Sequence, residues 1–183
     1  VENWPKIEIK GVTADVAVDS QDRVYTTVRD PLPDGQPARI DSVSGTMLIF
    51  DRDGGLIESW PAGTFSGPHG LSINEDDEIF HADTGHHTVT KYTATGAVLL
   101  ELGTKGKAGA PGEPFNMPSG LAIAPSGEIF VSDGYGGHRV HKFSPEGELL
   151  VSWGRQGTGP GEFALLHNLW VDRHSRVGIP SPI

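Results

Sequence analysis

The chain has 183 residues and no cysteine, and its 14 basic and 24 acidic side chains give a formal net charge of −10. This length suits one domain, and 36% hydrophobic with 21% charged residues excludes a disordered tail. No apolar run reaches the ~18 residues of a membrane span and the negative field repels phosphate backbones, so we expect neither membrane nor nucleic-acid partners. Glycine and proline together make up about a fifth of the chain, which disfavours long helices.

Similar segments recur along the chain at intervals of about fifty residues. Each unit opens with a short apolar run: DVAV at 15–18, PHGLSI at 68–73, PSGLAI at 118–123 and LHNLWV at 166–171. In the second and third units, EIFHAD at 78–83 and EIFVSD at 128–133 follow. Such short runs, separated by turn residues, are typical of β-strands.

The second half of each unit predicts a β-hairpin. Runs with period-2 apolar alternation lie at 47–60, 89–102 and 140–153, and each is interrupted by a turn that contains Gly54, Gly96 or Gly147. Glycine supplies the positive φ that a tight hairpin turn needs. Four short strands per unit of 40–50 residues predict an all-β fold, a β-propeller in one domain over residues 1–183. The expected blades cover about 13–60, 68–103 and 118–154, with a partial fourth at 166–177.

Three blades and the opening of a fourth are fewer than the ~4 to 8 blades of a closed propeller. An open ring leaves apolar blade faces exposed. Three explanations stay open: a piece of a longer protein, an open arc, or self-association of copies through the exposed faces. The Gly-rich segments 103–114 and 154–162 lack the GxxxxGK[ST] pattern of a phosphate loop, and we interpret them as connectors between blades.

The repeating unit resembles the NHL repeat over about residues 13–177. The residues that carry this resemblance are P-x-G-L-A-I, G-E-I-F-V-S-D-G-Y, R-V-x-K-F-S-P-x-G-E-L-L-x-S-W-G and G-P-G-E-F. Within that family, the details are most similar to the peptidyl-α-hydroxyglycine α-amidating lyase branch and its bacterial relatives. This resemblance implies a six-bladed propeller with a central zinc ion, and a C–N lyase that releases glyoxylate from a hydroxyglycine hemiaminal.

The resemblance also implies site residues. His69 in Pro-His-Gly-Leu and His167 in Leu-His-Asn-Leu match the motifs of two zinc ligands, so we expect zinc or a similar divalent metal there. Tyr135 in Ser-Asp-Gly-Tyr matches the catalytic tyrosine and would take a proton, and Arg29 aligns with an arginine that would hold a substrate carboxylate. The implied partner is a small-molecule or peptide substrate. The third histidine and a second arginine of the family have no counterpart, so this chain by itself is expected to be inactive.

A non-catalytic alternative stays open for these residues. His69 can be a turn or packing residue, Tyr135 can cap a blade, and the protein can be an NHL-repeat scaffold for protein interaction. His87 and His138 occupy equivalent repeat positions, which indicates structural roles. Asp83 and Asp133 also recur, and we expect their carboxylates to bind turn amides. Four histidines (81, 86, 141 and 174) are left unassigned, and the sequence leaves the compartment open.

Overall fold

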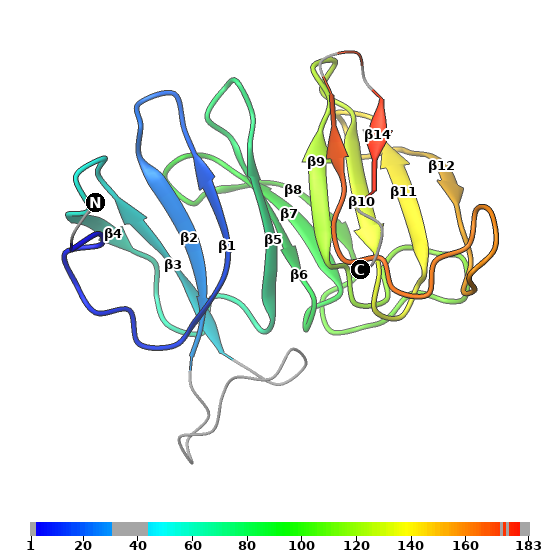
Figure 1. Cartoon of the computed structure of the whole chain (residues 1–183), viewed down its shortest axis with the longest axis horizontal. Helices are drawn as coiled ribbons and strands as arrows, with labels where there is room; N and C mark the ends of the chain where they lie inside the picture. The colour runs from blue at the N-terminus through cyan, green and yellow to red at the C-terminus, as the bar shows by residue number, and fades with distance from the viewer. Residues whose placement is uncertain (1–2, 31–43, 173, 175, 180–183) are drawn as a thin grey trace.

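The computed structural model describes residues 3–30, 44–172, 174 and 176–179, and within them every regular element is a β-strand (Figure 1). Three four-stranded antiparallel sheets each have their strands in sequence order. In chain order the strands are β1 Val12–Val18, β2 Val24–Arg29, β3 Gly45–Phe50, β4 Leu56–Ser59, β5 Pro68–Ile73, β6 Ile79–Asp83, β7 Thr88–Tyr92, β8 Val98–Gly103, β9 Gly120–Ile123, β10 Ile129–Asp133, β11 Arg139–Phe143 and β12 Leu149–Trp153.

A fourth sheet begins with β13 Trp170–Val171, paired antiparallel with β14 Val177–Gly178. It reaches one residue further than the expected end at 177, because Gly178 pairs with Trp170. Figure 1 shows the sheets side by side in chain order. The first strands β1, β5, β9 and β13 contact one another in succession and form the inner edge. The predicted all-β propeller with three complete blades and part of a fourth is confirmed.

The outer hairpins turn at the predicted glycines. Gly54, Gly96 and Gly147 have φ values of 86°, 83° and 93°, in the left-handed region that favours glycine. In each turn the glycine N–H donates to the carbonyl three residues earlier, on Asp51, Thr93 or Ser144. The side chains of these same three residues accept further turn N–H groups. Local sequence therefore sets the hairpin register in all three blades.

The hydrophobic core lies between blades. One cluster joins blades 1 and 2, and it includes Tyr25, Met47 and Trp60; the next joins blades 2 and 3 around Phe115. Trp60 also packs edge-on against Tyr92 at 5.2 Å between ring centroids, as expected for inter-blade packing. Because each blade buries its apolar residues only against a neighbour, an unpaired blade face stays open.

Buried aspartates bind the segment that enters each blade. Asp83 accepts the backbone N–H groups of Ser66 and Gly67, and Asp133 accepts that of Asn116. These contacts agree with the predicted role of both carboxylates. They hold the residues just before β5 and β9 in place.

A buried histidine accompanies each of these aspartates, although the two come from different strands. His81 lies on β6 opposite Thr90, whereas His141 lies on β11 opposite Val131. Each packs against the phenylalanine that precedes its blade, Phe65 or Phe115. These two unassigned histidines are therefore core residues.

His87 and His138 also follow the repeat. Both have positive φ, 59° and 52°. Nδ1 of His87 accepts the Met117 N–H at 3.1 Å, and Nδ1 of His138 lies 3.2 Å from the Phe163 carbonyl oxygen. Each ring contacts the segment leading to the next blade, in agreement with structural roles.

Apolar side chains are exposed at both ends of the sheet series. On β1, Val16 and Val18 are 58% and 54% exposed, and on β13 Trp170 is 53% exposed. In the described part of the chain, no helix has the length and apolar character to cross a bilayer.

Candidate active site at the inner strand ends

The four residues singled out in the sequence come from four separate segments. Arg29 ends β2, His69 is the second residue of β5, Tyr135 lies in the loop after β10, and His167 lies just before β13. Inner strands start, and second strands end, at the same edge of the sheets, because neighbouring strands are antiparallel. The topology therefore directs all four residues to one face of the propeller.

Three aromatic rings meet on this face. His69 Nε2 lies 2.9 Å from the Tyr135 hydroxyl, within hydrogen-bond distance. The ring centroids of His69 and His167 are 4.9 Å apart, and that of Tyr135 lies 5.4 Å from His69 and 5.8 Å from His167. His69 is buried, Tyr135 is half-buried and His167 is exposed. We call these three residues the axial cluster.

Arg29 lies beside the axial cluster. Its Nε donates to the Pro68 carbonyl at 2.9 Å, which fixes the side chain next to His69. Among the described residues it forms no ion pair, and its other guanidinium N–H groups find no acceptor there. A half-buried cation with free donors suits a carboxylate ligand.

Burial sets the protonation of the cluster. Burial, with the positive charge of Arg29 and the neighbouring His167, lowers the pKa of His69 to about 4, so its imidazole is neutral near pH 7. Burial raises the pKa of Tyr135 although Arg29 opposes the shift, so the hydroxyl is protonated. The cluster thus combines a neutral imidazole and a phenol that carries a proton.

Asp15 is an additional acidic residue near the site, and no motif in the sequence points to it. Its Oδ2 accepts the Leu71 N–H at 2.9 Å, and its Oδ1 accepts the Val16 N–H at 2.9 Å. Burial raises the pKa of Asp15, and these backbone bonds and the charge of His167 oppose the shift. The sequence does show one unusual feature at this position: Asp15 is acidic, whereas the equivalent residue of the next blade is Gly70.

The two histidines fit as a pair of metal ligands. Two imidazoles bound to one tetrahedral zinc at ~2.1 Å place their ring centres roughly 5 Å apart. The observed 4.9 Å between His69 and His167 matches this separation. The described residues contain no group of three or more His, Cys, Asp or Glu side chains placed to hold a metal. The described part of the chain thus offers two imidazoles at a separation that suits one metal ion.

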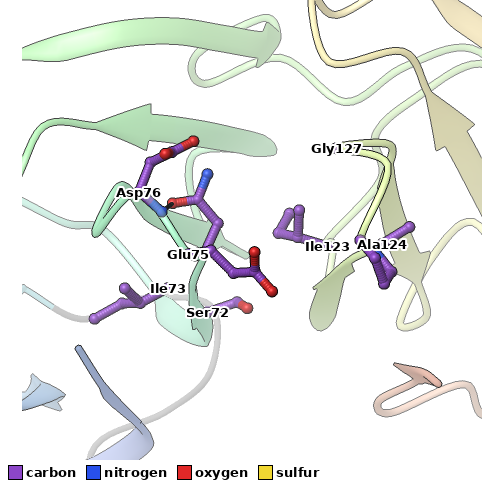
Figure 2. A pocket seen from close by; sticks show the side chains of 9 residues that line it. Ser72, Ile73, Glu75, Asp76, Ile123, Ala124 and Gly127 are labelled. Atoms are coloured by element: carbon purple, nitrogen blue, oxygen red, sulfur yellow. Dashed lines mark hydrogen bonds between the residues drawn. The ribbon is translucent and has the colours of Figure 1, made fainter. Parts of the chain in front are cut away.

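A separate hollow lies at the opposite ends of β5 and β9. It measures about 270 Å³ and lies between the turns that follow Ile73 and Ile123. Figure 2 shows these two sides and the Glu75 side chain extending into the gap between them. It shares no residue with the axial cluster, and a cluster of acidic side chains alone does not define a ligand.

Comparisons with known proteins identify the class. The model of the NHL repeat matches residues 115–143. The chain is 32% identical over 191 residues to NHL repeat-containing protein 3 of Mus musculus, covering 96% of this chain and 51% of that protein. It is 31% identical to peptidylglycine alpha-amidating monooxygenase of Rattus norvegicus, covering 94% of this chain and 20% of that protein.

It is also 35% identical to a probable peptidyl-alpha-hydroxyglycine alpha-amidating lyase of Caenorhabditis elegans, covering 68% of this chain and 36% of that protein. The protein is an NHL-repeat β-propeller, with amidating lyases among its relatives. The chain spans about half or less of the length of these curated relatives.

Solved structures agree on the fold. The WD40 β-propeller domain of Doa1 superposes with a TM-score of 0.63 at 15% identity, covering 92% of this chain and 47% of that one. A gluconolactonase from Xanthomonas campestris superposes with a TM-score of 0.58 at 20% identity, covering 94% and 55%. At these identities the likeness concerns the propeller fold alone.

Proposed function

We propose that the protein is a peptidyl-α-hydroxyglycine α-amidating lyase-like enzyme, a metal-dependent C–N lyase. The observation that carries this proposal is the meeting of His69, Tyr135 and His167, with Arg29 beside them, from segments up to 138 residues apart in the chain. The similarity to amidating lyases supports it.

The reaction breaks the bond between the amide nitrogen and the hydroxylated carbon of a C-terminal α-hydroxyglycine. The carbon–oxygen bond becomes the aldehyde of glyoxylate, the hydroxyl loses its proton, and the departing amide nitrogen gains one. The net change is a proton transfer from oxygen to nitrogen. A single group that accepts one proton and donates another therefore serves both steps.

Tyr135 is the group we assign to this transfer. Its hydroxyl carries a proton near neutral pH, so it can protonate the departing nitrogen while the substrate hydroxyl returns a proton to the phenol oxygen. The hydroxyl lies 2.9 Å from His69 Nε2, which places it beside the position where His69 would hold the metal. Arg29 holds the substrate carboxylate through the guanidinium N–H groups that have no acceptor among the described residues.

His69 and His167 would hold zinc or a similar divalent ion. A neutral imidazole is the form that binds metal, and the lowered pKa of His69 keeps it in that form. When bound, such an ion supplies Lewis-acid polarisation of the substrate oxygen. Copies of this chain, or further segments of a longer protein, would then have to complete the ligand set.

The direct test measures glyoxylate released from an N-acylated peptide that ends in α-hydroxyglycine, with zinc present and at protein concentrations where copies of the chain associate and can complete the ligand set. Arg29→Gln should lower kcat/KM for this substrate by roughly 100-fold, because it removes a charge-assisted contact to the carboxylate. A substrate whose carboxylate is amidated should be a poor substrate for the wild type and be affected little by the substitution. Equal losses with both substrates would contradict the assigned role of Arg29.

A non-catalytic interaction scaffold is the second candidate. It is favoured by the 32% identity to NHL repeat-containing protein 3, and by the described residues containing no group of three or more side chains placed to hold a metal. In that case, neither glyoxylate release nor metal binding should be observed. The exposed apolar faces of β1 and β13 would then serve association, including self-association.

A further inference from the structure

A groove of about 330 Å³ crosses the third blade on the face that carries the axial cluster. It is bounded by residues 109–113 of the connecting segment, by the loop at 136–139, and by residues 155–156. The groove begins one residue beyond the axial cluster in the chain, because Gly136 lines it and directly follows Tyr135. The Gly136 N–H donates to the Asn116 carbonyl at 3.0 Å, which holds the two walls together.

An unpaired arginine lies in this groove. The half-buried Arg139 guanidinium forms no hydrogen bond or ion pair with any residue in the described ranges, whereas Arg155 in the same groove pairs with Glu162 at 2.8 Å. A methyl group added to Gly112 would lie 3.8 Å from Nη2 of Arg139, so bare backbone faces the cation. A guanidinium without an acceptor is the donor set that a carboxylate satisfies with two parallel N–H···O bonds.

The groove is not a product of the repeat. In the second blade, Thr88 occupies the first position of the third strand, where the third blade has Arg139. The loop of the second blade carries His86, whose Nδ1 pairs with Asp83 at 2.8 Å, whereas the third blade has glycines before His138. The residue before the positive-φ histidine thus carries a side chain in blade 2, His86, and none in blade 3, Gly137. Because Arg139 and the glycines before His138 depart from the repeat, the packing of blades does not explain them.

Two other ionisable groups face the groove besides the arginines. Glu113 lines it and is exposed, and it does not come within ion-pair distance of Arg139. His138 lines it too, with its Nδ1 at the Phe163 carbonyl. The groove is therefore locally cationic at Arg139 in a protein whose net charge is −10. Glu113 should weaken the binding of an anion there.

We infer that Arg139 and this groove bind the carboxylate of an acidic side chain in the peptide part of the substrate. The inference rests on the proposed lyase function: Arg29 holds the terminal carboxylate, and the peptide runs outward past Tyr135 into the groove. The substrate class is then peptides with an aspartate or glutamate upstream of the C-terminal hydroxyglycine.

The test compares matched peptides by isothermal titration calorimetry. The probes are N-acetylated hexapeptides that end in ordinary glycine, with a single Glu or a single Gln at each of the three positions before it. The wild type should prefer Glu over Gln by roughly tenfold at one position, as expected for a charge-assisted hydrogen-bonded pair. Arg139→Gln should abolish the preference and Arg139→Lys should retain part of it. Glu113→Gln should increase the preference.

Arg155→Gln is the matched control, since it removes a cation from the same groove that already has a partner. It should leave the Glu preference unchanged, and the melting temperature of every variant shows whether it folds. Equal binding of the Glu and Gln peptides by the wild type at all three positions would overturn the inference. A preference that survives in a folded Arg139→Gln variant would overturn it as well.

The hydroxyglycine forms of the same peptides separate this inference from the proposed reaction. A Glu preference that needs Arg139, without glyoxylate release, would leave the groove assigned and refute the lyase function. Glyoxylate release at equal kcat/KM from Glu and Gln peptides would support the lyase function and refute the role of Arg139.

Discussion

Tyr135→Phe removes one hydroxyl and separates a structural role from a chemical one. The hydroxyl forms a 2.9 Å hydrogen bond with His69 Nε2, and His69 is only 6% exposed. Loss of such a bond lowers the free energy of unfolding by about 0.5–1.5 kcal/mol. Loss of a proton-transfer group lowers kcat by roughly 10²–10⁴, which is about 3–5 kcal/mol in the activation barrier.

Urea denaturation and glyoxylate release, measured on the same preparation, give these two quantities. Tyr92→Phe is the control, because Tyr92 is half-buried, interacts through its hydroxyl with Thr90 and packs on Trp60 away from the axial cluster. It should reduce stability to a similar degree and leave kcat unchanged. If Tyr135→Phe destabilises the protein and retains kcat within about threefold, the role in proton transfer is refuted and Tyr135 is a structural residue.

Three further predictions concern the scaffold. Burial lowers the pKa of His81 below the ~6.5 of an unfolded chain, although Asp83 opposes the shift. Unfolding therefore takes up a proton, and the free energy of unfolding falls as pH drops from about 6.5. His81→Val should make this fall with pH less steep in urea titrations, and an unchanged slope would contradict the role of His81. Phe115→Ala, at a fully buried position between blades, should lower the free energy of unfolding in urea by about 3–5 kcal/mol. Leu150→Ala, at a 50% exposed position, should lower it by less than about 0.5 kcal/mol. Equal losses would contradict the assignment of Phe115 to the core between blades. Val16→Glu should reduce concentration-dependent association in sedimentation velocity, and an unchanged distribution would exclude the β1 face.

The blades could be predicted from the sequence because their determinants are local. Alternation of apolar residues, a glycine at each outer turn and a fifty-residue repeat fix the strands within a few positions. Gly54 and Gly147 adopt the positive φ that this pattern requires. Residues 31–43, between β2 and β3, lie outside the described residues.

The meeting of His69 and His167 could also be predicted, since equivalent repeat positions face the same axis. The role of Asp15 could not, because its bond to the Leu71 N–H and its charge interaction with His167 depend on how the first blade sits against the others. The lack of a partner for the Arg139 guanidinium among the described residues could not be predicted either, for a similar reason. Whether a charged side chain has a partner is a property of tertiary packing, and no spacing in the sequence encodes it.

The shared role of the two buried histidines, His81 and His141, could not be predicted from the repeat. The repeat places a histidine near each buried aspartate, but it comes from β6 in one blade and from β11 in the next. Alignment of the units therefore separates two residues that fill the same space. Cross-strand pairing, seen only in the structure, explains why His81 and His141 have one role.

Metal content decides whether the axial cluster holds a metal ion. Elemental analysis of the purified protein should find about one zinc or similar divalent ion per axial site, and the His69→Ala, His167→Ala double variant should contain none. The double variant of His87 and His138, which lie outside the axial cluster, should keep its metal. Absence of metal from the wild type after incubation with zinc, or equal content in both double variants, would contradict the assignment of these two histidines and, with it, the metal-dependent lyase site.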